Sequence, residues 1–169
     1  GRWTPDASVP VLRAMIGQYG IESGHMETVH AYTNDQNLID NYHKNNRRGR
    51  GAPLNMVITE TGASSAVVKL LPELDGKLTG NAIRVPTPNV SLAILNLTLG
   101  RTVTEEEVGA YLRGVSLHSD MQRQIDYTTS PDMVSSDLVG NRPARIVDGE
   151  ATIVNDTRVV AYVWHAPES

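Results

Sequence analysis

The chain has 169 residues, a formal net charge of −4, 40% hydrophobic residues and no cysteine. This length suits one domain with its own core, so we expect a single domain over residues 1–169, and the negative charge disfavours a general nucleic-acid-binding protein. Without cysteine there is no disulfide, thiolate metal site or cysteine nucleophile, and without an apolar run near the roughly 20 residues that span a bilayer we expect a cytoplasmic protein that does not contact membranes.

The first predicted elements are a helix and a strand. The helix has Pro10 in its first turn and Gly20 at its end, which are the favoured places for these residue types. A strand follows over residues 25–32, because apolar and polar residues alternate there. From Asn34 to Asn55 the composition becomes polar, and an irregular segment of this length is usually functional or disordered.

The rest of the chain predicts two more helices and several strands. Thr104 begins a capping-box pattern that starts the last helix, and its glutamates suit the positive end of the helix dipole better than a metal site. The predicted elements are a helix over 63–71, strands over 81–87 and 90–99, the helix that starts at Thr104, and short strands over 125–127, 133–139, 145–148, 151–154 and 159–164. Strands interleaved with helices predict an α+β fold with a mixed, mostly antiparallel sheet and helices packed on one face.

His30 is the first candidate functional residue. It lies near the end of the predicted strand beside a polar segment, where a proton-transfer group is well placed. The alternative is a half-buried structural histidine. A Ser-His-Asp hydrolase is a further alternative, with Asp35 or Asp137 orienting the ring, although no serine lies in a Gly-x-Ser-x-Gly elbow.

Basic residues and a helix start suggest an anion site. The residues are Lys44, Arg47, Arg48 and Arg50 in the polar segment, Arg84 in a strand, and Thr61-Gly62 before a helix. Arginine matches the geometry of phosphate, and a helix start offers free N–H groups to an anion. The alternative is a solvated charged loop beside an ordinary helix cap.

A metal site is not predicted. His25, Glu27 and His30 are close in sequence, but on a strand the first two share one face while His30 lies on the other. His43 and His118 are isolated in the sequence, and there is no cysteine to complete a zinc site.

Several segments resemble, in order, the catalytic domain of the phosphorylating glyceraldehyde-3-phosphate dehydrogenase family of glycolysis. The likeness runs from about Pro10 to about Trp164. It is carried by Thr28-Val29-His30-Ala31-Tyr32-Thr33-Asn34-Asp35-Gln36, Arg47-Arg48-Gly49-Arg50, Thr61-Gly62-Ala63, Leu71-Pro72-Glu73-Leu74, Ile83-Arg84-Val85-Pro86-Thr87-Pro88 and Val134-Ser135-Ser136-Asp137.

The resemblance implies a fold and a site. It implies an eight-stranded mixed sheet with helices on one face, and a long S-shaped loop over residues 34–55 that meets the cofactor and a neighbouring subunit of a homo-oligomer. In the family, the histidine matching His30 activates the catalytic thiol and acts as acid and base. The residues matching Thr33 and Arg84 bind the substrate phosphate, and those matching Thr61, Gly62 and Arg48 bind inorganic phosphate.

The sequence also departs from the family pattern. Trp3 stands at the position of the catalytic cysteine, no Gly-x-Gly-x-x-Gly stretch is present, and the sequence after Trp164 differs from the family. These departures predict a gene fragment or fusion without a dinucleotide-binding domain or bound NAD, inactive as a dehydrogenase but still binding phosphate or sugar phosphate. A weak esterase- or lactonase-like hydrolase that uses His30 and a self-associating interaction module are the alternatives.

Overall fold

The computed structural model describes residues 8–31, 56–59, 62–87, 90–118, 125–134 and 144–166. The helices are α1 (Val9–Tyr19), α2 (Ala63–Leu70), the short 3-10 helix η4 (Pro72–Leu74) and α3 (Glu105–His118). The strands are β1 (Ile21–Ala31), β2 (Val57–Thr59), β3 (Leu78–Val85), β4 (Ser91–Leu99), β5 (Asp126–Thr128), β6 (Ala144–Asp148), β7 (Ile153–Asn155) and β8 (Arg158–Ala166).

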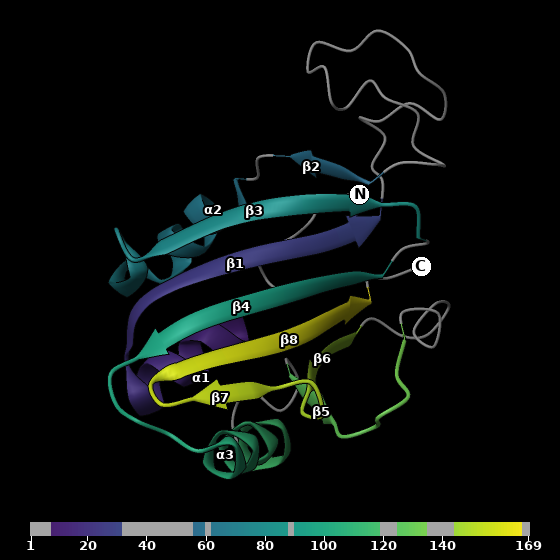
Figure 1. Cartoon of the computed structure of the whole chain (residues 1–169). Coiled ribbons are helices and arrows are strands. Elements are labelled where there is room, and N and C mark those ends of the chain that lie inside the picture. Colours follow the sequence, from purple (N-terminus) through teal and green to yellow (C-terminus); the bar gives the residue numbers. More distant parts are fainter. Residues whose placement is uncertain are drawn as a thin grey trace, which may run out of the picture.

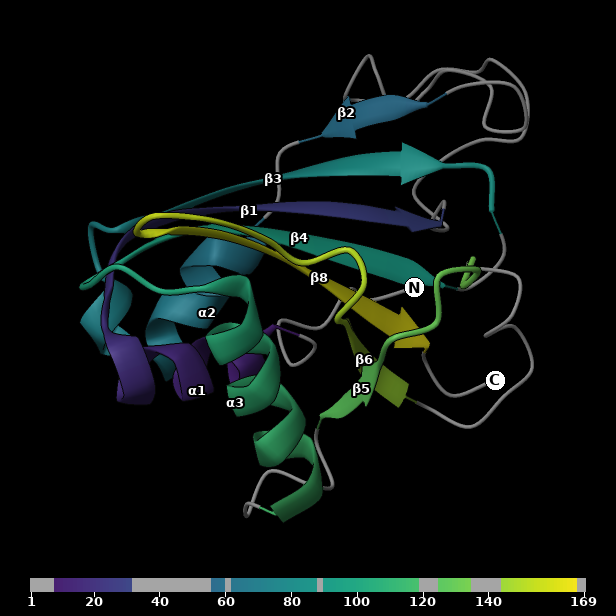
Figure 2. The same ribbon diagram turned by 60° about the horizontal axis from the view of Figure 1, so that its bottom comes forward.

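The strands form one eight-stranded sheet in the order β2-β3-β1-β4-β8-β6-β5, and β7 pairs with β8 beside this path (Figure 1). The β1–β3 and β5–β6 pairs are parallel, and the other pairs are antiparallel. Figure 2 shows α1, α2 and α3 on the same face of this sheet. The expected α+β fold, with a mostly antiparallel mixed sheet and helices on one face, is confirmed. None of the helices in the described parts of the chain is long and apolar enough to cross a membrane.

The expected elements differ from the structure mainly at their ends. Strand β1 begins at Ile21 rather than at residue 25, and β2 was not expected at all. Met133 and Val134 lie outside any strand, and the rest of the expected strand over 133–139 lies outside the described residues. The segment expected to form the S-shaped loop, residues 34–55, also lies outside them.

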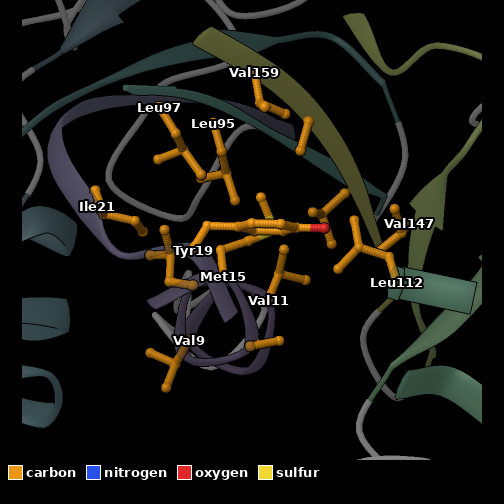
Figure 3. Close-up of a cluster of buried hydrophobic side chains, with 14 of the residues drawn as sticks. Val9, Val11, Met15, Tyr19, Ile21, Leu95, Leu97, Leu112, Val147 and Val159 are labelled. Carbon is orange, nitrogen blue, oxygen red and sulfur yellow. The ribbon is translucent and has the colours of Figure 1, made fainter. Parts of the chain in front are cut away.

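The core fills the space between the sheet and the helices. Gly20 ends α1 with a φ of 74°, a conformation that glycine adopts without strain, and the chain turns at once into β1. Figure 3 shows the ring of Tyr19 lying between Met15 of α1 and the strand residues Leu95 and Leu97. These side chains belong to one buried apolar cluster, so burial of the sheet's inner face holds α1 in place.

Polar contacts fix α3 against α1. The hydroxyl of Tyr111 donates to the carbonyl oxygen of Ala14 at 2.8 Å, and the rings of Tyr111 and Tyr19 meet edge to face at 5.6 Å. The hydroxyl of Thr104 accepts from the backbone N–H of Glu107 at 3.1 Å, so the predicted cap of α3 forms. The contacts of Tyr111 thereby hold α3 against α1.

Alternation along the strands separates two faces. In β1, Met26, Thr28 and His30 are buried, whereas the intervening Glu27 and Val29 are partly exposed. The side chain of Met26 belongs to the core, so the buried set faces the helices. His30 is the last member of this set, and it lies at the carboxyl end of β1.

Candidate functional site

The candidate site is built on two parallel strands. Strands β1 and β3 pair in a register that places His30 directly beside Arg84. Nη1 of Arg84 lies 2.9 Å from Nδ1 of His30, a hydrogen bond between residues 54 positions apart in the sequence. This contact follows from the strand register. The same register places Thr28 beside Ala82 and Met26 beside Gly80, closer to the core.

The pair sits in a desolvated environment. Only 5% of the surface of His30 is exposed. Burial, and secondarily the positive charge of Arg84, lower the pKa of His30 to about 4. Both causes act on the protonated ring, because burial removes its hydration and the guanidinium repels it. The imidazole is therefore neutral at physiological pH.

The hydrogen bond fixes which nitrogen of His30 carries the proton. A guanidinium has only donors, so Nδ1 must accept and the neutral ring keeps its proton on Nε2. A ring in this form donates a hydrogen bond from Nε2 and has no free basic nitrogen. The site can therefore offer N–H donors to an anionic or developing oxyanion ligand, one from the imidazole and others from the guanidinium.

Helix α2 packs against β3 through a close contact at Gly80. A Cβ on Gly80 would lie 2.9 Å from Cβ of Ser64 and 3.2 Å from Cγ of Met26. Glycine is thus required for the first turn of α2 to reach the strand. Gly62, at the N-cap of α2, is exposed, and its carbonyl oxygen accepts from the N–H of Ala66 at 2.9 Å.

Three of the six predicted site residues lie in the described parts of the chain: His30, Gly62 and Arg84. The structure brings His30 and Arg84 together, and it places Gly62 at the start of α2. Thr33, Arg48 and Thr61, as well as Trp3, lie outside the described residues.

The opposite face of the sheet carries a separate polar cluster. His25 contacts the hydroxyl of Thr79 through Nδ1 at 2.7 Å and a carboxylate oxygen of Glu27 through Nε2 at 2.8 Å. The strand alternation predicted that His25 and Glu27 share a face away from His30, and this is what the structure has. Among the described residues, no group of three His, Asp or Glu side chains is arranged to hold a metal ion.

Two hollows lie away from the His30–Arg84 pair. One, of about 540 Å³, is bounded by Gly109 and Arg113 of α3, by Tyr127, and by Gly149 after β6. The other, of about 630 Å³, is lined by the first residues of β1 and β8 and the last residues of β4, with His25 among them. Neither of these two hollows is lined by His30, Gly62 or Arg84.

Residues 4–166 match the family model described as "Glyceraldehyde 3-phosphate dehydrogenase, C-terminal domain". The chain belongs to this family. It is 65% identical over 165 residues to a protein of Pseudomonas aeruginosa (strain UCBPP-PA14) called "Glyceraldehyde-3-phosphate dehydrogenase-like protein", covering 98% of this chain and 36% of that protein.

Dehydrogenases from other bacteria match over the same region. Identity is 42% over 167 residues to "Glyceraldehyde-3-phosphate dehydrogenase 1" of Bacillus subtilis (strain 168), and 41% over 165 residues to the enzyme of Kitasatospora aureofaciens. Each match covers 98% of this chain and 49% of the relative. The chain thus spans about half, or less, of the length of these glyceraldehyde-3-phosphate dehydrogenases.

The glyceraldehyde-3-phosphate dehydrogenase family uses NAD, and the described residues do not fit that cofactor. A dinucleotide site needs a glycine-rich turn between a strand and a helix N-terminus, where the pyrophosphate meets free N–H groups. The helix that follows β2, α2, is entered through Gly62 alone, and no Gly-x-Gly-x-x-Gly stretch occurs in the sequence. We therefore derive no chemical step through NAD from these residues.

Proposed function

We propose that this chain, as a single domain over residues 1–169, is the substrate-binding half of a glyceraldehyde-3-phosphate dehydrogenase, with His30 and Arg84 as its binding pair. The observation that supports this most is the 2.9 Å hydrogen bond that joins these two side chains in a buried setting. A guanidinium matches phosphate oxygens and keeps its charge at every physiological pH. The Nε2–H of His30 supplies a donor beside it.

We infer that the ligand is phosphate or a sugar phosphate. The family resemblance assigns substrate phosphate to Thr33 and Arg84, and inorganic phosphate to Arg48, Thr61 and Gly62. Burial of His30 gives this assignment a physical basis, since hydrogen bonds to charged groups are stronger where water is excluded.

The proposed chemistry stops at binding. Covalent oxidation of the aldehyde in this family starts from a thiolate, and none of the 169 residues is a cysteine. Trp3 occupies the matching position by alignment. We infer that the chain binds the substrate without oxidising it, and that NAD does not bind to these residues alone.

Calorimetric titration with glycerol 3-phosphate, and with glycerol as the uncharged comparison, tests this function. Wild type should bind the phosphate ester and not glycerol, and Arg84→Gln should weaken binding by about tenfold or more, as expected for losing charge-assisted hydrogen bonds. Arg158→Gln is the matched control, because Arg158 is an exposed arginine at the far end of β8. Equal affinity in all three proteins would refute the site.

A weak hydrolase based on His30 receives less support from the geometry. A general base needs a free ring nitrogen with a pKa near the working pH. Nδ1 is engaged by Arg84, and the pKa of His30 is lowered to about 4. Ester and lactone hydrolysis should therefore be equal in wild type and His30→Ala. A loss of turnover in the variant would instead support a hydrolase that uses His30.

We also propose that the chain self-associates through the outer face of its sheet. Figure 2 shows no described helix over this face. Ile58 and Ile153, in edge strands, are 51% and 53% exposed. Large exposed apolar side chains near an open sheet face favour association with a second copy. Sedimentation over a range of concentrations should give a dimer or larger species, and a monomer at all concentrations would exclude this.

A further inference from the structure

A row of polar side chains crosses the helix-covered face of the sheet at the carboxyl end of β1. In strand order, the row consists of Arg84 in β3, His30 in β1, Ser91 in β4, His165 in β8 and Arg145 in β6. It therefore has a histidine–arginine pair on each side of a central serine. The first pair is the candidate site described above, and the second pair is His165 with Arg145.

The strand registers build this row. His30 pairs with Arg84 across β1–β3, Ser91 pairs with His165 across β4–β8, and Arg145 pairs with His165 across β6–β8. Strands β1 and β4 join the two pairs. Their register places Val29 beside Leu92, and the next position along it brings His30 opposite Ser91.

The second pair faces the helices, as the first pair does. Side chains two positions apart in a strand share a face. Arg145 is two positions before Val147, and His165 is two positions after Val163; both valines are 0% exposed and belong to the main core cluster. Arg145 and His165 are thus on the inner face, at the edge of the core.

Arg145 has a buried donor that the described protein does not satisfy. Its Nε is buried without a hydrogen-bond partner in the structure. Two carboxylates, Asp126 in β5 and Asp148 in β6, are close to Arg145 along the strands, but both lie on the opposite face of the sheet. Asp126 pairs with Ile146, and Asp148 accepts from the indole N–H of Trp164 at 3.0 Å. A buried guanidinium donor that meets no acceptor among the described residues is a favourable place for an anion.

We propose that Arg145 and His165 form an oxyanion-binding site, separate from the His30–Arg84 pair, for the phosphate or carboxylate group of a small molecule. The guanidinium of Arg145 supplies the charge and a planar set of donors, and the hydroxyl of Ser91 lies in the same row as a further donor. With neighbouring strands about 4.8 Å apart, the Cα atoms of Arg84 and Arg145 are roughly 19 Å apart, so the two pairs can respond to ligand independently.

Inorganic phosphate, titrated into the full chain while the imidazole NMR signals of His30 and His165 are followed, tests this site. Both histidines should shift in wild type. Arg145→Gln should weaken the response of His165 by about tenfold or more and leave that of His30 unchanged. Arg84→Gln should do the reverse, so failure of the proposed phosphate function and failure of this site are distinguishable.

Three controls make the result decisive. Arg158→Gln, at an exposed arginine of β8, should behave as wild type. Sodium acetate in place of phosphate separates a carboxylate site from a phosphate site, and a His165 response to either anion supports the proposal. Arg145→Lys keeps the charge but not the planar fork and should bind with intermediate affinity, which serves as the test if Arg145→Gln does not fold.

Several outcomes would overturn the site. A His165 response that is unchanged in Arg145→Gln would show that the arginine does not bind the anion. Loss of both histidine responses in either single variant would show one shared site. An equally weakened His165 response in Arg158→Gln would show that the effect arises from general surface charge.

Discussion

Arg84 donates from Nη1 to Nδ1 of His30 across two parallel strands, at 2.9 Å, and this contact sets both the tautomer and the basicity of the ring. Arg84 must be the donor in this hydrogen bond, because a guanidinium cannot accept one. The histidine is consequently a neutral Nε2–H donor in the folded chain.

Removing the guanidinium should raise the pKa of His30 only part of the way to its ordinary value. The pKa is lowered from 6.5 to about 4, with burial as the larger cause and Arg84 as the smaller. In Arg84→Gln the burial remains, so the pKa should rise but stay below 6.5. Titration of the imidazole NMR signals measures both values, and the nitrogen shifts report the tautomer. A wild-type proton on Nδ1 would contradict the contact.

The stability of the chain should fall on acidification because of His30. The unfolded histidine has a pKa of 6.5 and the folded one about 4, so the unfolded state binds more protons between these values. The contribution is present above pH 6.5 and is lost as the pH falls through about 4, up to about 3 kcal/mol.

Urea unfolding at several pH values between 4 and 7.5 measures this loss. His30→Gln should flatten the dependence, because glutamine does not titrate. His25→Gln is the control, since His25 lies on the outer face and contacts a carboxylate. An equally steep dependence in wild type and His30→Gln would assign the loss to other groups.

Gly80→Ala should destabilise the contact between α2 and β3. The added Cβ would meet Cβ of Ser64 at 2.9 Å and Cγ of Met26 at 3.2 Å, so one of them must move. We expect a loss of about 1–3 kcal/mol in the free energy of unfolding.

Two further variants identify the cause. Ser64→Gly in the Gly80→Ala background should recover part of the loss, as a double-mutant cycle would show. Gly114→Ala, in α3, has nothing within 4 Å of the added Cβ and should stabilise the chain by about 0.5–1 kcal/mol through helix propensity. A neutral Gly80→Ala would show that the backbone accommodates the methyl group freely.

Asp148→Ala should destabilise the turn between β6 and β7. One carboxylate oxygen accepts from the indole N–H of Trp164 at 3.0 Å, and the other accepts from the backbone N–H of Ala151 at 3.1 Å. Asp148 is only 7% exposed, so both donors lose a buried partner, at a cost of about 2–4 kcal/mol.

Thermal unfolding monitored by far-UV circular dichroism, a signal that does not depend on Trp164, follows this change. Trp164→Phe, which removes one of the two donors, should cost less than Asp148→Ala. Asp148→Asn keeps an acceptor and should fall between wild type and Asp148→Ala. A larger effect in Trp164→Phe would place the stabilisation in packing of the indole ring.

The sequence predicted the strand that carries His30 and the face on which the histidine lies. Alternation of apolar and polar residues is a local property, and it placed His30 opposite His25 and Glu27 as the structure has it. Helix signals were equally local, and Pro10, Gly20 and Thr104 have their expected places. Strand β2 was missed because three residues carry too little periodicity to be recognised.

The sequence could not predict which side chains meet across the sheet. His30 and Arg84 are separated by 54 positions, and His165 is farther still along the chain from Ser91; neither pair has a local signal. Strand order and register decide these contacts, because they are set by burial of the whole inner face against the helices. Arg145 illustrates this, since it reads as an ordinary basic residue at the start of a short strand.

The sequence alone thus determined the fold class, the family and the candidate residues, because periodicity, capping and motif spacing are properties of neighbouring positions. The tertiary structure decided that His30 is a buried neutral donor held by Arg84, and that a second histidine–arginine pair stands in the same row. Both conclusions depend on desolvation and on long-range strand pairing, and these arise only once the sheet is assembled and covered.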